Sequence, residues 1–447
     1  TDIWQSIDNI ALPCLSPDAQ QVIPPTRWSG PGLSLEQSNP FSPSTGLRSW
    51  GEFMAQISRG NHPAGPNVNG TKGLGVKIAV LDMAAWIQEY INSEGAIQGA
   101  RHEDLLNIKL EGRDTDHAPV RMIFDPIATR PQRGTGVLGL IGATDNDFGV
   151  TGIATEAETY FFPVVDADLG FREMSAWLNA IDTMSSGDII TATYESNYYD
   201  VGDDCVSLAT DPVTITYIGL ALDAGINVIV PAGDGGCNIG DALATTSIPE
   251  IPNCIIVGGA LPNPFSQRWW TSNYTETTVG ESSTEGGSQT PIAPDLTCAS
   301  WVGPLVTTGG NLNLTQVAID TVPDTPGGDP EGYISLDQRR RSYTNDFGNN
   351  VQDGGSMAAT ALTAGTLACT QGFSLQLFGV QMPPFKLVSL PFATGTPKIN
   401  PLEQNTNSSW LAATTAPPYY VFDNQFESGA PWSPGRLIQA AEMGQAM

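Results

Sequence analysis

Basic residues are scarce in this sequence. Only 19 lysines and arginines stand against 47 aspartates and glutamates, so the 447-residue chain has a formal net charge of −28. A surface of this sign repels nucleic acid and anionic membranes, and it attracts cations such as Ca²⁺. We therefore expect no nucleic-acid partner. The same charge would also serve plain solubility.

Long apolar stretches are missing as well. No run approaches the ~18 consecutive apolar residues of a membrane-spanning helix, so we expect no membrane span. Hydrophobic residues still make up 40% of the chain, which is enough for an ordinary core, and the length allows one large domain with additions or two domains. The many glycines and prolines and the few lysines are typical of secreted, extracellular or cell-surface proteins.

The cysteines lack the C-x-x-C spacing of a zinc site. Six are present, at Cys14, Cys205, Cys237, Cys254, Cys298 and Cys369. For a secreted protein we expect disulfides, and six cysteines allow fifteen pairings. Glycosylation sequons, whose support for a glycoprotein is weak, begin at Asn69, Asn273, Asn313 and Asn407.

The chain divides into three parts by composition. Residues 1–71, rich in Pro, Ser, Gly and Asn, predict an irregular arm wrapped on the surface of a domain. That domain is predicted over 72–400, with a long loop insertion at 303–353 that is rich in Gly, Pro and Asp. The tail at 401–447 predicts an extension that is loop-like at first and helical from Gly435 to Met447.

Strand and helix patterns alternate within the domain. Apolar runs typical of buried parallel strands lie at 76–82, 159–165, 188–192, 226–230 and 254–258. Helical patterns lie at 173–184, 213–224 and 355–367. This alternation predicts an α/β fold with a doubly wound, mostly parallel sheet and helices on both faces. Sites in such sheets form beyond the carboxyl ends of the strands, where Asp82 closes the first run.

Four separated segments hold the residues that carry chemistry: 75–83, 133–141, 224–234 and 354–360. Together and in this order they resemble the motifs of the subtilase family of subtilisin-like serine proteases, over roughly 73–400. The resemblance implies a subtilisin-like fold. It places Asp82, Arg133 and Ser356 at the positions of the catalytic aspartate, histidine and serine, and Asp234 at that of the oxyanion-hole asparagine.

The chain departs from the family at these positions. A serine hydroxyl is a poor nucleophile until an adjacent base takes its proton, and the guanidinium of Arg133 stays protonated at any ordinary pH. We expect Arg133 to form an ion pair with Asp82 instead. Asp234 would repel an oxyanion when ionised, where an asparagine would donate to it. Sedolisins, relatives on the same fold, do use an aspartate here, but they carry a glutamate where this chain has Arg133.

The substrate-binding strand of the family also differs in this chain. Thr193, Tyr194 and Glu195 align with a strand end that family members finish with a glycine beside the substrate backbone. We expect Tyr194 and Glu195 to crowd that groove and make it acidic.

Several residues have two readings. Ser356 either keeps a chemical role or caps the helix that follows it, and Asp82 is read as structural through its pairing. A missing base could be replaced by His102 or His117, both in an insertion at 98–120, although a surface histidine is the commoner case.

Charged clusters give two further alternatives. Arg339-Arg340-Arg341 is read as a solvated loop that balances nearby acids, as an interface patch or as a processing site. The acidic stretches at 145–147 and 200–204 could hold Ca²⁺ through oxygen ligands, although neither has the spacing of an EF-hand loop.

The sequence thus favours a secreted subtilase homologue without catalytic activity, acting as a structural or binding module with protein partners or by self-association. One alternative is an active serine hydrolase that uses Ser356 with an unorthodox base, in acid through Asp234. Another is a regulator that captures peptides in a remnant cleft.

Overall fold

A computed structural model gives the structure of part of the chain. It describes residues 72–111, 120–125, 129–146, 150, 152–194, 207–236, 239, 251–260, 269, 271–273, 297–302, 305–309, 339–340, 342–347, 355–394 and 436–437. The predicted arm at 1–71 lies outside these residues, as does most of 303–353 and of 401–447.

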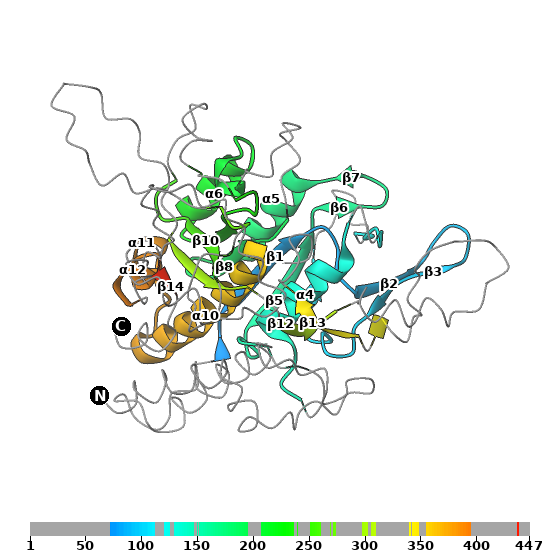
Figure 1. The fold of residues 1–447 in the computed structure, drawn as a ribbon, viewed down its shortest axis with the longest axis horizontal. Helices are drawn as coiled ribbons and strands as arrows, with labels where there is room; N and C mark the ends of the chain where they lie inside the picture. Colours follow the sequence, from blue (N-terminus) through cyan, green and yellow to red (C-terminus); the bar gives the residue numbers. More distant parts are fainter. Residues whose placement is uncertain are drawn as a thin grey trace, which may run out of the picture.

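An eight-stranded sheet forms the centre of the fold, and all of its neighbouring strands run parallel (Figure 1). From one edge to the other its order is β14 (Arg436–Leu437), β11 (Cys298–Trp301), β10 (Ile255–Ala260), β9 (Asn227–Pro231), β8 (Ile189–Ala192), β1 (Lys77–Asp82), β5 (Glu158–Pro163) and β4 (Lys109–Leu110). All five predicted strand runs contribute strands to this sheet, because continuous apolar runs can be buried on both faces.

Helices cover both faces of the sheet (Figure 1). Helices α4 (Pro131–Gly142) and α10 (Gly355–Phe378) pack on one face, and α5 (Glu173–Thr183) and α6 (Thr214–Asp223) pack on the other. Side chains along β1 alternate between the two cores, since Ile78 and Val80 face α4 and α10 while Ala79 and Leu81 face α5 and α6. The expected α/β fold with a doubly wound parallel sheet is confirmed.

Within the described residues, three antiparallel pairs stand outside the sheet. They are β2 (Ile87–Ile91) with β3 (Ile97–Arg101), β6 (Val165–Asp166) with β7 (Gly170–Phe171), and β12 (Leu305–Thr308) with β13 (Tyr343–Phe347). Short helical segments complete the described fold at Leu208–Thr210 (3₁₀), Pro384–Leu387 (α11) and Ser389–Thr394 (α12).

The β12–β13 pair falls within the stretch predicted as a loop insertion and packs on α4. The hydroxyls of Thr307 and Thr308 donate to the carbonyls of Gly136 and Thr135, at 2.8 and 2.7 Å. Gly139 allows this close approach, because a Cβ built on it would lie 2.2 Å from the Thr308 hydroxyl.

Two elements differ from their predictions. Helix α10 continues to Phe378 rather than ending at 367, and it stops where Gly379 takes a φ of 74°. Residues 436–437 form strand β14 instead of starting a helix, because they pair with Cys298 and Ala299 at the sheet edge. Among the described helices, none combines the length and apolar character needed to cross a bilayer.

We predict opposite effects for alanine at two helical glycines. Gly139→Ala should lower the free energy of unfolding by about 1–3 kcal/mol, because the new methyl group would overlap β12. Gly219→Ala in α6 should raise it by about 0.5–1 kcal/mol, because no atom lies within 4 Å of the added Cβ. Urea denaturation of both variants provides the measurement. Equal effects at the two positions would contradict the packing of β12 on α4.

Candidate functional site

The site lies where the winding of the sheet changes direction. Strand β1 has β5 on one side and β8 on the other, so the connections diverge from it. In open α/β sheets a crevice forms at such a point, beyond the carboxyl ends of the strands. Asp82 is the last residue of β1 and therefore lies at the carboxyl end of this strand, where it is fully buried.

Asp82 and Arg133 form a fully buried ion pair, which confirms the pairing expected from the sequence. Arg133 Nη2 lies 2.7 Å from Asp82 Oδ1, and neither side chain is exposed to solvent. The same oxygen accepts the backbone N–H of Met83 at 2.7 Å. Asp82 Oδ2 accepts the hydroxyl of Thr193 at 2.8 Å. Both carboxylate oxygens are therefore bonded within the protein.

The first turn of α4 brings Arg133 to this position. Pro131 occupies the first turn, where its missing N–H costs nothing, after Arg130 with a φ of 41°. Gly134 then lets the helix backbone approach the segment after β1, because a Cβ there would lie 2.2 Å from the carbonyl oxygen of Ala84. No motif of the sequence predicted this contact, although the glycine directly after Arg133 was its signal.

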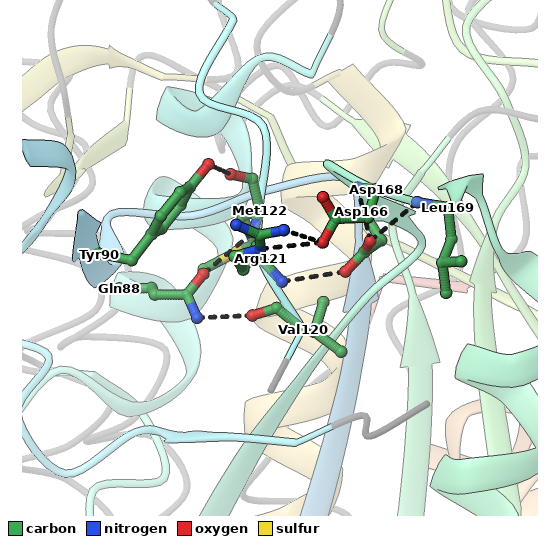
Figure 2. A network of polar contacts seen from close by, with 8 residues as sticks. All are labelled: Gln88, Tyr90, Val120, Arg121, Met122, Asp166, Asp168 and Leu169. Atoms are coloured by element: carbon green, nitrogen blue, oxygen red, sulfur yellow. Dashed lines mark hydrogen bonds and ion pairs between the residues drawn. The ribbon is translucent and has the colours of Figure 1, made fainter. Parts of the chain in front are cut away.

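Residues 120–122, which precede α4 in the sequence, are held from two sides (Figure 2). The Gln88 amide of β2 donates to the carbonyl of Val120 at 2.6 Å and accepts the N–H of Met122 at 3.0 Å. From the other side, the Asp166 carboxylate accepts the N–H of Arg121 at 3.0 Å, and the Arg121 guanidinium pairs with Asp168. These contacts fix the chain entering α4, and no motif in the sequence pointed to them.

Ser356 and Asp234 meet in a second group at the carboxyl side of β9. Both carboxylate oxygens of Asp234 accept the N–H of Ser356 at 2.8 Å, and Oδ2 also accepts its hydroxyl at 3.1 Å. The Ser356 oxygen in turn accepts the N–H of Gly233 at 3.1 Å. Ser356 is fully buried and Asp234 nearly so. The negative carboxylate at the start of α10 is also favoured by the helix dipole.

Gly355 is required by this arrangement. It has a φ of 39°, and a Cβ on it would lie 2.1 Å from Asp234 Oδ2. The Gly355-Ser356 pair of the sequence motif therefore makes room for a carboxylate against the helix terminus.

The predicted effect of Tyr194 on the substrate groove is wrong. Successive residues of an extended chain point to opposite faces, so Thr193 faces Asp82 while Tyr194 points to the α5 side. The Tyr194 hydroxyl donates to Glu173 and accepts the indole N–H of Trp177 at 2.8 Å. Burial first, and then the nearby Glu173 charge, raise the pKa of Tyr194. Glu195 lies outside the described residues.

His102 is a core residue rather than a surface histidine, and both of its ring nitrogens make structural contacts. Its Nδ1 accepts the backbone N–H of Asp104 at 3.1 Å, and its Nε2 lies 2.5 Å from the carbonyl oxygen of Ser342. Burial lowers its pKa to about 4. The ring therefore stays neutral and has both nitrogens occupied at neutral pH. His117 lies outside the described residues.

The two charge clusters make internal contacts. The Arg339 guanidinium lies 4.8 Å from the ring centre of Trp86, and Arg340 pairs with Glu89 of β2. In the acidic stretch at 145–147, Asp145 pairs with Lys72 at 2.8 Å. Within the described residues, no three His, Cys, Asp or Glu side chains are grouped as metal ligands. Arg341, Asp147 and 200–204 lie outside that part.

Two modifications expected for a secreted chain are not possible at the described positions. Cys254 and Cys369 are buried free thiols in the cores of opposite sheet faces, so a framework that pairs all six cysteines is wrong. Burial raises the pKa of Cys254 to about 12, and it also raises that of Cys369. The sequon at Asn273 is closed to glycosylation in the folded chain, because its buried amide donates to Ala232 O at 3.0 Å.

Comparison with known proteins gives likenesses in structure alone. No protein-family model and no curated protein matches the chain. Similar solved structures include a lanthipeptide protease, with 15% identity, a TM-score of 0.47, and coverage of 84% of this chain and 89% of that one. The prenylagaramide maturation protease PagA has 16% identity, a TM-score of 0.44, and coverage of 78% and 89%. A cold-adapted subtilisin-like serine proteinase has 15% identity, a TM-score of 0.41, and coverage of 77% and 91%.

We predict that Arg133→Met will lower the free energy of unfolding by about 3–5 kcal/mol, because it leaves the Asp82 carboxylate buried without a counter-charge. The double variant Asp82→Asn with Arg133→Met should recover most of that loss. Arg340→Met is the matched control, since it breaks an exposed pair and should cost about 0–1 kcal/mol. Urea denaturation measures all three. Equal losses in Arg133→Met and Arg340→Met would show that the buried pair contributes no more to the free energy of unfolding than the exposed one.

The start of α10 gives another prediction. Gly355→Ala should lower the free energy of unfolding by about 2–4 kcal/mol, because it combines a left-handed backbone with overlap against Asp234. Gly379→Ala has the same backbone handicap but no atom within 4 Å, so it should cost only about 1 kcal/mol. Thermal denaturation of both variants measures the difference. The placement of Asp234 against α10 is refuted if the two losses are the same.

Proposed function

We propose that this chain is a subtilase homologue without conventional peptidase activity, which serves as a structural or binding module in an extracellular assembly. The observation that carries the proposal is the buried pair of Asp82 and Arg133. Its subtilase part rests on the four sequence motifs. Their residues form two bonded pairs, Asp82 with Arg133 at the carboxyl end of β1, and Asp234 with Ser356 between the segment after β9 and the start of α10.

The pair supports the loss of base catalysis. In triad chemistry the aspartate orients a histidine that accepts the serine proton. Here the residue beside Asp82 is a guanidinium, which has donors only and no acceptor. The second oxygen of Asp82 is taken by Thr193. This carboxylate therefore holds a permanent cation in place and has no base to orient.

The surroundings of Ser356 support the same conclusion. A nucleophile must reach the substrate, whereas the Ser356 hydroxyl is fully buried and bonded to Asp234 and Gly233. An oxyanion formed beside this serine would meet the carboxylate of Asp234. Where an asparagine would donate one hydrogen bond, worth roughly 10²–10³ in rate, the aspartate would oppose the developing charge.

One contact favours a different function. The Ser356 hydroxyl donates to Asp234 Oδ2 at 3.1 Å, which is the contact that a serine hydrolase with a carboxylate base would use. Such an enzyme would have to uncover both residues before a substrate could bind. The alternative is therefore an acyl-transfer hydrolase that opens around Ser356.

The extracellular role rests on composition. Scarce lysines, a net charge of −28 and many glycines and prolines support a secreted or surface-exposed protein, and the acidic surface would attract Ca²⁺. Protein partners or self-association are the proposed mode of action. Nucleic acid is not a proposed ligand.

A fluorophosphonate probe, which labels reactive serines, tests the loss of activity. We expect no labelling of the full chain between pH 3 and 8, beside a reactive subtilisin as positive control. Labelling that disappears in Ser356→Ala would overturn the proposal in favour of the hydrolase.

A variant with Arg133→His and Asp234→Asn gives the experiment a second arm. If it becomes labelled while Ser356→Ala in the same background does not, the two substitutions account for the silence of the site. If the double variant folds but is still not labelled, the burial of Ser356 rather than the two substitutions would explain the missing reaction with the probe.

A further inference from the structure

His102 binds the antiparallel pair β12–β13, called the hairpin below, in addition to the contacts that this pair makes with α4. The ring Nε2 donates to the carbonyl of Ser342, directly before β13, at 2.5 Å. The same carbonyl accepts the N–H of Gly309, directly after β12, at 2.9 Å. His102 therefore binds the point where the two strands of the hairpin are tied together.

The hairpin is in turn the cover of α4. Thr307 and Thr308 donate to two carbonyls of that helix, and the Phe347 ring occupies the space that a Cβ on Gly136 would need. Helix α4 carries Arg133 of the buried pair. A change in the protonation of His102 can therefore affect Arg133 through the hairpin β12–β13, which covers α4.

Only one form of the imidazole fits these contacts. Nδ1 must accept the N–H of Asp104, so the proton has to be on Nε2. A second proton on Nδ1 would set two donors against each other and leave a cation in a fully buried position. Protonation and the closed hairpin are therefore incompatible.

We infer that His102 is an acid-sensitive latch, which holds β12–β13 on α4 while the imidazole is neutral and releases the hairpin when it is protonated. This device does not depend on the proposed loss of peptidase activity. Its release would uncover the glycine-rich face of α4.

The charged and titratable neighbours do not compensate the protonated ring. Tyr343 of β13 packs edge-on against the imidazole at 5.1 Å between ring centres, and its hydroxyl donates to Glu103 at 3.3 Å. Burial raises the pKa of Asp104 to about 7, so below that pH its carboxyl is largely neutral. Arg340, which reaches Glu103 through its backbone and Glu89 through its side chain, adds positive charge.

Asp104 is held from the side of α4 rather than by the hairpin. Its carboxyl accepts the N–H of Val150 at 2.7 Å and the amide of Asn146 at 3.0 Å, and both residues belong to the connection after α4. The acid response of the hairpin is assigned to His102, and an Asp104→Asn variant separates the titration of the two groups. The contribution of His102 to closure is fully present above pH 6.5, and it is lost as the pH falls toward 4.

Hydrogen exchange of the full chain tests the latch. After division by the intrinsic exchange rates, we expect the opening constant of β12–β13 to be roughly 30-fold higher at pH 5 than at pH 7.5, from a ring pKa of about 4 when closed and 6.5 when open. The amides of β1 should keep their protection over the same range and serve as the internal reference.

Three variants identify the group responsible. His102→Asn keeps an acceptor for Asp104 but cannot titrate, so its hairpin should open readily and independently of pH. A variant that replaces the other two histidines of the chain, His62→Gln/His117→Gln, should keep the acid response. An Asp104→Asn variant should keep it as well. The latch is refuted if His102→Asn retains that response, or if either control loses it.

A measurement on the unmodified chain keeps the test valid should His102→Asn fail to fold. With ¹⁵N-labelled histidine rings, the His102 signal should remain that of the neutral Nε2–H form down to about pH 5. A ring that titrates near pH 6.5 while β12–β13 stays protected would overturn the inference.

Discussion

A carboxylate and a guanidinium that are both removed from water must satisfy each other, and this requirement organises the centre of the molecule. Asp82 ends the strand at which the sheet reverses its winding, and Arg133 reaches it from the first turn of α4. Pro131 and Gly134 allow the helix to start there and to approach the chain after β1. The pair thereby ties the covering helix to the strand that separates the two halves of the sheet.

Buried polar groups also satisfy each other at the start of α10. Asp234 satisfies the N–H and the hydroxyl of Ser356 with one carboxylate, and Gly355 leaves the space that this carboxylate needs. The hydrogen bonds between Asp234 and Ser356 stabilise the first turn of α10. The four positions Asp82, Arg133, Asp234 and Ser356 thus hold buried polar groups that are bonded in two pairs.

Polar contacts also connect the outer elements to this centre. Gln88 and Asp166 hold the segment that enters α4, and His102 holds the hairpin that covers it. These contacts come from the connections rather than from the sheet. The position of Arg133 therefore depends on residues more than thirty positions away along the chain.

The sequence by itself determined the sheet and the pairing at its centre. Continuous apolar runs are buried on both faces wherever they form parallel strands, so five strands, α5 and α6 could be located within a few residues. The pairing of Asp82 with Arg133 followed from the resemblance to the subtilase motifs, which places the two residues near each other, and from the chemistry of a permanent cation beside a buried acid.

Tertiary structure decided which way the remaining side chains point and what they meet. Tyr194 turned away from the groove because the alternation of an extended chain places it on the α5 side, which depends on register. His102 is a core residue because Ser342, far away in the sequence, packs against it. The strand at 436–437 formed because an edge of the sheet was available there, and no local pattern contains that information.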